Sequence, residues 1–181
     1  MWRKNMHIIT PDFYNQSLTE IDWQKIPSLG IELLFLDIDN TLAPDGSRQA
    51  DLATINLLKE MKKAGLSLCV LSNAKAERGA EFTKNLGIPY LGLAMKPLAF
   101  KIKSFLRKQG LKPERCLMIG DQLFTDVMAG RRSGCKTLLV PPLAEDLSGF
   151  VRWKRKLENY CFRHGLDLQA IPALPKCKRL Q

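Results

Sequence analysis

The chain has 181 residues, 45% of them apolar and 25% charged, which is typical of a soluble globular protein with one hydrophobic core. Its longest apolar runs are far shorter than the roughly 20 residues that a membrane-spanning helix needs, so we expect no transmembrane segment. The first residues lack the apolar stretch and the cleavage site of a signal peptide. These features predict a cytoplasmic protein.

Positive charge is concentrated in two segments. The net charge is +10, from 28 Lys and Arg against 18 Asp and Glu. Residues 96–115 hold seven basic groups and one acidic group, and residues 151–181 hold eight and two. Such clusters favour an anionic partner: a phosphate ester, an anionic membrane surface or a nucleic acid.

The cysteines and histidines argue against a zinc site. The five cysteines are widely spaced with no CxxC pair, and the two histidines, His7 and His164, lie far apart. We interpret the cysteines as reduced structural thiols.

Short apolar runs alternate with amphipathic stretches along the middle of the chain, which indicates repeated β-strand and α-helix units. Glycines 65, 87, 110 and 134 follow the predicted helices, as helix C-caps do. The pattern predicts a Rossmann-like three-layer α/β sandwich around a parallel sheet. We divide the chain into an N-terminal extension (1–30), a core (31–144) and a basic C-terminal helix and tail (145–181). The predicted strands are 33–38, 66–71, 90–93, 116–119 and 137–140, and the predicted helices are about 50–64, 75–86, 97–109 and 125–133.

The C-terminal region predicts one more amphipathic helix, and two interpretations of it remain open. In the first, its apolar face packs on the sheet and its charges lie in water. In the second, the helix rests on anionic lipid. Residues 171–181 contain two prolines and three basic groups, and we predict a loosely held tail. The apolar face holds Leu147, Phe150, Val151, Trp153, Leu157, Tyr160 and Cys161, and the opposite face holds Arg152, Arg155, Lys156 and Arg163.

Polar side chains follow four of the predicted strands, at the edge where parallel α/β sheets bind ligands. Taken singly, each could be a helix cap, a turn residue or a surface lysine. Together they supply a carboxylate nucleophile, oxygen ligands for Mg²⁺ and positive charge for phosphoryl oxygens. The stretches are Asp37-Ile38-Asp39-Asn40-Thr41, Ser72-Asn73, Lys96-Pro97 and Gly120-Asp121 with Thr125-Asp126.

These four stretches, in this order, resemble the motifs of the haloacid dehalogenase superfamily. The resemblance implies that Asp37 is the nucleophile that forms an aspartyl-phosphate and that Asp39 is the general acid and base. It also implies that Mg²⁺ is bound by Asp37, Asp121 and the backbone carbonyl of Asp39. Lys96 would offset phosphoryl charge.

The remaining motif residues would bind the substrate or support the metal. Thr41, Ser72 and Asn73, together with Lys96, are predicted to hold the phosphoryl group, with the Ser72 hydroxyl and an adjacent backbone N–H on its oxygens. Asp126 would orient Lys96 or a metal-bound water.

The spacing of the motifs leaves no room for a cap domain, since only 33 positions separate Asp39 from Ser72 and 24 separate Ser72 from Lys96. The chain thus resembles the capless subclass IIIA, and in particular the YqeG-like phosphatases related to mitochondrial phosphatidylglycerophosphate phosphatase. An open site suits a phosphomonoester on something too large to enclose. The resemblance therefore implies a lipid substrate, hydrolysis of phosphatidylglycerophosphate to phosphatidylglycerol, and peripheral contact with the inner face of an anionic membrane.

Three alternatives remain at this stage. One is a phosphatase for a soluble sugar or nucleotide phosphate, with a neighbouring subunit of an oligomer covering the site. Another is a nucleic-acid 3′-phosphatase, which the lack of an aromatic stacking platform disfavours. The third is a phospho-receiver signalling module, which Asp39 disfavours because an acid there would speed hydrolysis of the acyl phosphate.

Overall fold

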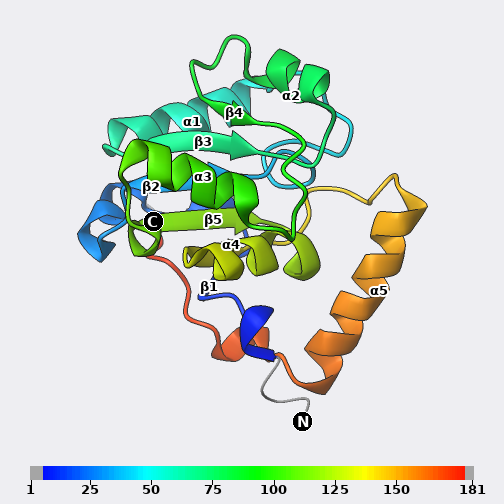
Figure 1. Cartoon of the computed structure of the whole chain (residues 1–181). Helices are drawn as coiled ribbons and strands as arrows, with labels where there is room; N and C mark the ends of the chain where they lie inside the picture. The colour runs from blue at the N-terminus through cyan, green and yellow to red at the C-terminus, as the bar shows by residue number, and fades with distance from the viewer. Residues whose placement is uncertain (1–5, 178–181) are drawn as a thin grey trace.

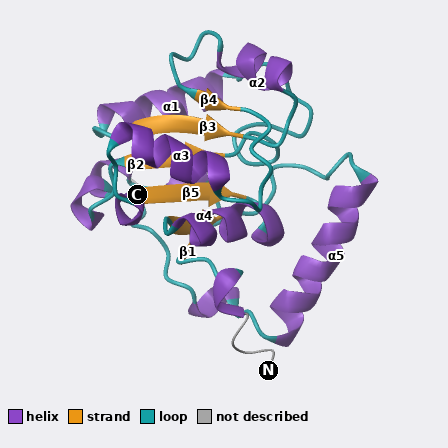
Figure 2. Ribbon diagram, in the orientation of Figure 1, coloured by secondary structure: helices purple, strands orange, loops and turns teal. Residues whose placement is uncertain are grey.

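The computed structural model describes residues 6–177, which form a six-stranded, fully parallel sheet with helices on both faces (Figures 1 and 2). The strand order is β1-β6-β5-β2-β3-β4. The strands are β1 (Phe13–Tyr14), β2 (Leu33–Leu36), β3 (Ser67–Leu71), β4 (Tyr90–Leu91), β5 (Cys116–Gly120) and β6 (Lys136–Leu139). This arrangement confirms the predicted α/β fold.

Alternate residues of the central strands feed two separate cores, so the molecule has three layers. Leu34 and Leu36 of β2 face a core with Leu58 and Met61 of α1 (Leu52–Lys63). Phe82 of α2 (Ala76–Thr83) joins this core. In the sequence, the central strands are continuous apolar runs because helices cover both faces of the sheet.

The opposite face of the sheet packs against two other helices. Leu33 and Phe35 share a core with Ile102 of α3 (Phe100–Gln109) and Ala129 of α4 (Met128–Ser133). The cysteines of β3 and β5, Cys69 and Cys116, are buried there, and all five cysteines are free thiols.

The predicted helices and strands are present; most are shorter than predicted, while β5 is one residue longer and β6 is shifted by one residue toward the N-terminus. Gly110 and Gly134 cap α3 and α4 in the left-handed conformation, which confirms their predicted role. The predicted helix at 125–133 is α4 preceded by a π-helical turn, Leu123–Val127. Strand β1 was not predicted, because two residues are too short to show a period. It pairs with β6 at the edge of the sheet.

No inserted domain interrupts the described part of the chain between Asp39 and Ser72, which holds a loop, α1 and β3. Within residues 6–177, no helix is both long and apolar enough to cross a bilayer.

The C-terminal helix α5 (Gly149–His164) is oriented opposite to the first interpretation. Phe150, Trp153 and Tyr160 are exposed, whereas Glu158 is buried and Arg155 points into the molecule. The interpretation that its apolar face packs on the sheet is therefore wrong. Specific ion pairs, described below, outweigh the burial of the apolar face.

The prediction of a loosely held tail is wrong for residues 171–177, and residues 178–181 lie outside the described part. Leu174 is buried in the main core, and its N–H donates to Asn15 Oδ1 at 2.9 Å. The Cys177 N–H donates to the carbonyl of Glu20 at 2.9 Å. The end of the described chain is therefore fixed to the N-terminal segment.

Candidate active site

The predicted motif residues meet at the carboxyl edge of the sheet, because all the strands are parallel. Asp37 directly follows β2, Ser72 follows β3 and Asp121 follows β5, while Lys96 lies in the connection from β4 to α3. A cavity of about 140 Å³ opens here. Its lining residues are Asp37, Asp39, Asn40, Asp45, Ser72, Asn73, Lys96, Gln122, Thr125, Asp146, Ser148, Val151 and Lys154.

Lys96 forms the centre of a buried ion-pair cluster. Its Nζ lies 2.7 Å from Asp37 Oδ1 and 2.6 Å from Asp126 Oδ1. Burial lowers the pKa of Lys96, but Asp126 and Asp37 outweigh it, so that the pKa rises and the ammonium stays charged. Burial raises the pKa of Asp37 well above its ordinary value, although Lys96 opposes this shift.

Asp126 is held in place by contacts that only a glycine permits. Its Oδ2 accepts from the Gln122 N–H at 3.1 Å, and a Cβ added to Gly120 would lie 2.2 Å from its Cγ. Its other oxygen contacts Lys96. Asp126 therefore contacts the lysine directly, and its role in orienting Lys96 stays a prediction.

Three buried carboxylates form a group that suits a hard cation. Asp37, Asp121 and Asp126 each place one oxygen within 4.8 Å of the others. Mg²⁺ binds oxygens at about 2.1 Å, so small movements would let Asp37 and Asp121 share one ion. Asn40 Oδ1 is buried without a hydrogen-bond partner in the same cavity, and a metal-bound water would satisfy it. These donors fit a divalent metal ion.

Asp121 accepts hydrogen bonds from two sides. The Thr41 hydroxyl donates to its Oδ1 at 3.3 Å, and the guanidinium of Arg155 contacts both its Oδ2 and its backbone carbonyl. Burial raises the pKa of Asp121 to about 7 even though Arg155 lowers it, and Asp126 adds to the rise. A cation bound here would offset this cost.

Asp39, the predicted acid and base, lies at the rim of the cavity and is less buried than Asp37. Its Oδ1 accepts from the Gly46 N–H at 3.1 Å, and its Oδ2 forms an ion pair with Arg78 of α2. The side chain of Asp39 is 25% exposed, which leaves it accessible to a leaving group or a water.

Ser72 and Asn73 occupy the positions expected from the motif but have intramolecular partners. The Ser72 hydroxyl accepts from the Ala74 N–H at 3.0 Å. The side chain of Asn73 receives the Lys96 N–H at 2.7 Å and donates to the Lys96 carbonyl at 3.0 Å. Asn73 thus fixes the backbone of the lysine.

Arg155 is the main site residue that the motifs do not predict. Besides Asp121, it contacts Asp146 Oδ2 and Glu158 Oε2, each at 3.0 Å. Burial lowers its pKa, but these carboxylates, Asp121 first, raise it overall. In the sequence Arg155 is one of several basic residues on a helix face, and nothing marks it as the one that points inward.

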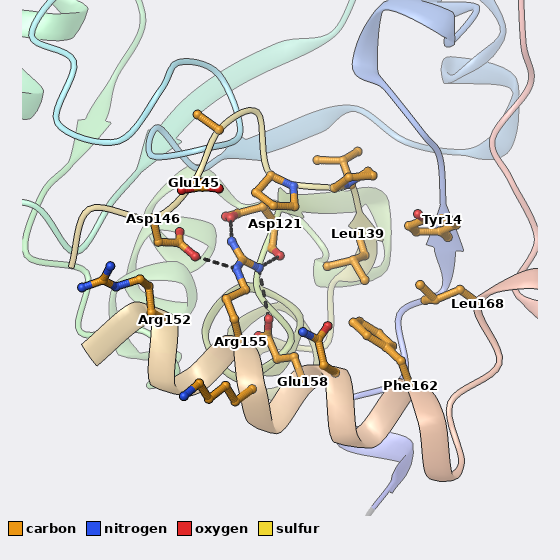
Figure 3. A pocket seen from close by; sticks show the side chains of 16 residues that line it. Tyr14, Asp121, Leu139, Glu145, Asp146, Arg152, Arg155, Glu158, Phe162 and Leu168 are labelled. Atoms are coloured by element: carbon orange, nitrogen blue, oxygen red, sulfur yellow. Dashed lines mark hydrogen bonds and ion pairs between the residues drawn. The ribbon is translucent and has the colours of Figure 1, made fainter. Parts of the chain in front are cut away.

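Helix α5 contributes to the site through its connection as well. Asn40 Nδ2 donates to Asp146 Oδ1 at 2.8 Å, and the Leu143 N–H donates to the Asn40 carbonyl at 3.0 Å. A larger hollow of about 700 Å³, lined in part by Arg155 and its carboxylate partners, lies between α5 and the end of β6 (Figure 3). The loop after the predicted nucleophile and the start of α5 are therefore joined.

Three comparisons show that the chain is similar to known phosphatases. A family model described as HAD-hydrolase-like matches residues 94–142. The chain is 34% identical over 149 residues to the probable phosphatase YqeG of Bacillus subtilis (strain 168), covering 82% of this chain and 87% of that protein. It is 26% identical to phosphatidylglycerophosphate phosphatase 1, chloroplastic/mitochondrial, of Arabidopsis thaliana, covering 86% of this chain but only 47% of that protein.

A solved structure has a similar fold. It is the cobalt-bound form of the deoxy-D-mannose-octulosonate 8-phosphate phosphatase of Haemophilus influenzae, with a TM-score of 0.51 and 16% identity. The match covers 77% of this chain and 90% of that one.

Proposed function

This chain belongs to the haloacid dehalogenase-like hydrolases and is a phosphatase, and from that premise we propose that it acts through an aspartyl-phosphate on Asp37 and that its substrate is phosphatidylglycerophosphate. Membership of a phosphatase family also removes the phospho-receiver alternative. The observation that carries the proposal is the convergence of Asp37, Lys96, Asp121 and Asp126 in one buried cluster.

Phosphoryl transfer needs positioning and charge compensation more than covalent assistance. Mg²⁺, held by Asp37, Asp121 and the backbone carbonyl of Asp39, would supply a Lewis acid that reduces the repulsion between the nucleophile and a phosphate dianion. Lys96 adds a permanent positive charge beside Asp37, because its two ion pairs keep it protonated.

The protein side chains account for the bonds and protons of the two steps. A carboxylate oxygen of Asp37 forms a bond to phosphorus while the bond from phosphorus to the leaving oxygen breaks, and Asp39 gives that oxygen a proton. Water then attacks the phosphorus of the acyl phosphate and transfers a proton to Asp39. Inorganic phosphate leaves, and Asp37 and Asp39 return to their initial states.

The choice of a lipid substrate rests on the shape and charge of the site rim. The described chain has no cap between Asp39 and Ser72 to enclose a substrate. Lys154 of α5 lines the same cavity as Asp37, and its Nζ donates to Gln122 Oε1 at 3.0 Å. Phosphatidylglycerophosphate carries a phosphodiester close to its terminal phosphate, and Lys154 lies where it could bind that second charge.

A phosphate-release assay with Mg²⁺ tests the proposal. Phosphatidylglycerophosphate in mixed micelles is compared with glycerol 3-phosphate, a nucleoside monophosphate and an oligonucleotide 3′-phosphate, with Asp37→Asn as the blank. We expect the lipid to be hydrolysed with the highest kcat/KM. Faster turnover of a soluble ester or the oligonucleotide would contradict the lipid assignment, while activity of Asp37→Asn equal to the wild type would contradict the nucleophile.

A substitution of Lys154, at the rim of the cavity, distinguishes binding of the substrate's phosphodiester from the catalytic steps. Lys154→Gln should raise KM for phosphatidylglycerophosphate about tenfold, consistent with loss of one charge-assisted hydrogen bond. It should leave kcat/KM for glycerol 3-phosphate, which has no diester, nearly unchanged. Equal losses on both substrates would argue against this role for Lys154.

A further inference from the structure

Helix α5 presents an apolar surface to solvent that nothing in the described chain covers. Phe150, Trp153, Leu157 and Tyr160, here called the outer stripe, are 68%, 55%, 40% and 61% exposed. The rings of Phe150 and Trp153 stack with centroids 6.2 Å apart. Exposed aromatic clusters of this kind on a single helix mark interaction surfaces.

The outward orientation of the stripe is fixed by contacts on the opposite side of α5. Glu158 Oε1 accepts from the Leu123 N–H at 2.7 Å, and Arg155 binds the Asp121 carboxylate and backbone carbonyl (Figure 3). Rotating the helix to bury the stripe would break these buried bonds and leave their partners unpaired. The exposure of the stripe is therefore a stable property of the fold.

Basic side chains flank the outer stripe. With 3.6 residues per turn, Lys156 and Arg163 lie along one side of the stripe and Lys154 along the other. Lys154 Nζ also lies 5.2 Å from the centre of the Phe150 ring. Glu158, the one acidic residue of α5, is buried on the inner side.

The outer stripe continues toward the active-site cavity. Ser148, Val151 and Lys154, at the start of α5, line the same cavity as Asp37. Lys96 lines the same cavity and is followed four residues later in the chain by Phe100, which is 74% exposed. A surface that covers the stripe would thus lie beside the predicted nucleophile.

We infer that the outer stripe of α5 docks on an anionic phospholipid surface, with its aromatic side chains at the level of the headgroups and its flanking basic side chains on lipid phosphates. Charge decides between this occupant and a second copy of the chain. Pairing two such helices would bring their basic flanks together, whereas anionic lipid complements them. The inference rests on the proposed lipid substrate, but binding of the protein to lipid vesicles can be measured without any hydrolysis of that substrate.

Co-sedimentation of the full chain with vesicles tests the inference. Vesicles of phosphatidylglycerol mixed with phosphatidylcholine should bind the protein, and vesicles of phosphatidylcholine alone should bind it at least tenfold more weakly. The double variant Phe150→Ser, Trp153→Ser should lose on the order of 100-fold in partitioning. A matched control is Leu29→Ser, an exposed leucine that precedes β2 at the opposite edge of the sheet.

A second comparison tests the basic side chains that flank the stripe. It uses two double variants that each remove two positive charges, so that their net charges are equal. Lys156→Gln, Arg163→Gln should weaken binding about 25-fold, because each basic residue near an anionic surface contributes about fivefold. Arg107→Gln, Lys108→Gln at the end of α3 removes the same charge from another surface and should have little effect. Equal losses in the two pairs would mean that overall charge, and not this face of α5, drives binding.

Two further measurements can overturn the inference. Trp153 fluorescence should shift to shorter wavelength on anionic vesicles, and the shift should disappear in Trp153→Phe, which keeps an aromatic ring and should still bind. Sedimentation velocity in the absence of lipid should show no dimer that depends on the stripe; a dimer abolished by Phe150→Ser, Trp153→Ser would assign the stripe to a second copy.

The result is distinguishable from failure of the proposed function. Binding to phosphatidylglycerol vesicles without hydrolysis of phosphatidylglycerophosphate would support docking and reject the substrate. Hydrolysis of the lipid in detergent micelles by a protein that does not bind vesicles would support the substrate and reject docking. Vesicle binding that is unchanged in both α5 double variants would overturn the docking surface.

Discussion

The Asp121 carboxyl links the metal site to the stability of the fold. Burial raises its pKa from 3.8 to about 7, in spite of Arg155. The unfolded chain would titrate near the lower value, so the folded protein binds this proton more tightly. The protonated Asp121 carboxyl therefore adds to the free energy of unfolding below about pH 4, and this contribution is lost as the pH rises toward about 7.

The size of the effect follows from the two pKa values. A difference between 3.8 and about 7 corresponds to roughly 4 kcal/mol, a large share of the 5–15 kcal/mol that stabilises a typical domain. Asp121→Asn keeps the shape of the side chain and removes its titration. Without divalent metal, the variant should match the wild type near about pH 4 and exceed it by up to about 4 kcal/mol above about pH 7.

Urea unfolding followed by circular dichroism, across this pH range in chelator and in excess Mg²⁺, measures the difference. Mg²⁺ should stabilise the wild type at the higher pH values and leave Asp121→Asn nearly unaffected, because only the wild type gains a compensated charge. Glu60→Gln, an exposed carboxylate on α1, is the control and should change stability little. If Asp121→Asn were less stable than the wild type above about pH 7 in chelator, the pairing with Arg155 would outweigh burial and the reasoning would be refuted.

Three further predictions concern the catalytic cluster. Asp39→Asn should slow turnover by about 10²–10⁴-fold and accumulate an aspartyl-phosphate visible by intact mass spectrometry, because hydrolysis of the phosphorylated Asp37 loses its base; an unchanged rate would exclude the role. Lys96→Met should destabilise the fold by about 3–5 kcal/mol in urea, since it leaves two buried carboxylates facing each other, and adding Asp126→Asn should recover part of the loss. Gly120→Ala should cost about 2 kcal/mol or more in thermal unfolding because its Cβ would overlap Asp126, whereas Gly149→Ala, with its nearest neighbour at 4.0 Å, should be neutral; equal effects would contradict the packing.

The fold could be predicted from sequence wherever a strand is buried on both faces. Such strands are continuous apolar runs, as β2 and β5 are. The residues after α3 and α4 adopt the left-handed conformation, which favours the glycines found there. Strand β1 could not be found this way, because Phe13–Tyr14 is too short for any period and is defined by its pairing with β6.

The positions of the site residues were predictable because parallel strands bring their carboxyl ends to one edge. Asp37, Lys96 and Asp126 meet as the motifs imply. Their catalytic roles remain predictions. The involvement of Arg155 and Arg78 was not predictable, since an arginine on an amphipathic helix has the same local pattern whether it faces solvent or a carboxylate.

The same limit explains the error about α5. Amphipathicity identifies two faces of a helix but does not say which one turns inward, and burial of apolar area normally decides. Here the inner face is chosen by Glu158, which accepts from two backbone N–H groups, and by Arg155. Individually directed polar bonds have no period in the sequence.

The attachment of the chain end to the N-terminal segment limits how far α5 can travel. The helix is anchored before its start through Asp146 to Asn40, and after its end through Leu174 to Asn15. A segment tethered at both ends can tilt or slide by a small distance without leaving the molecule. Deleting the residues after His164 would remove the second tether, and α5 would then be held only by Asp146 and by the inward contacts of Arg155 and Glu158.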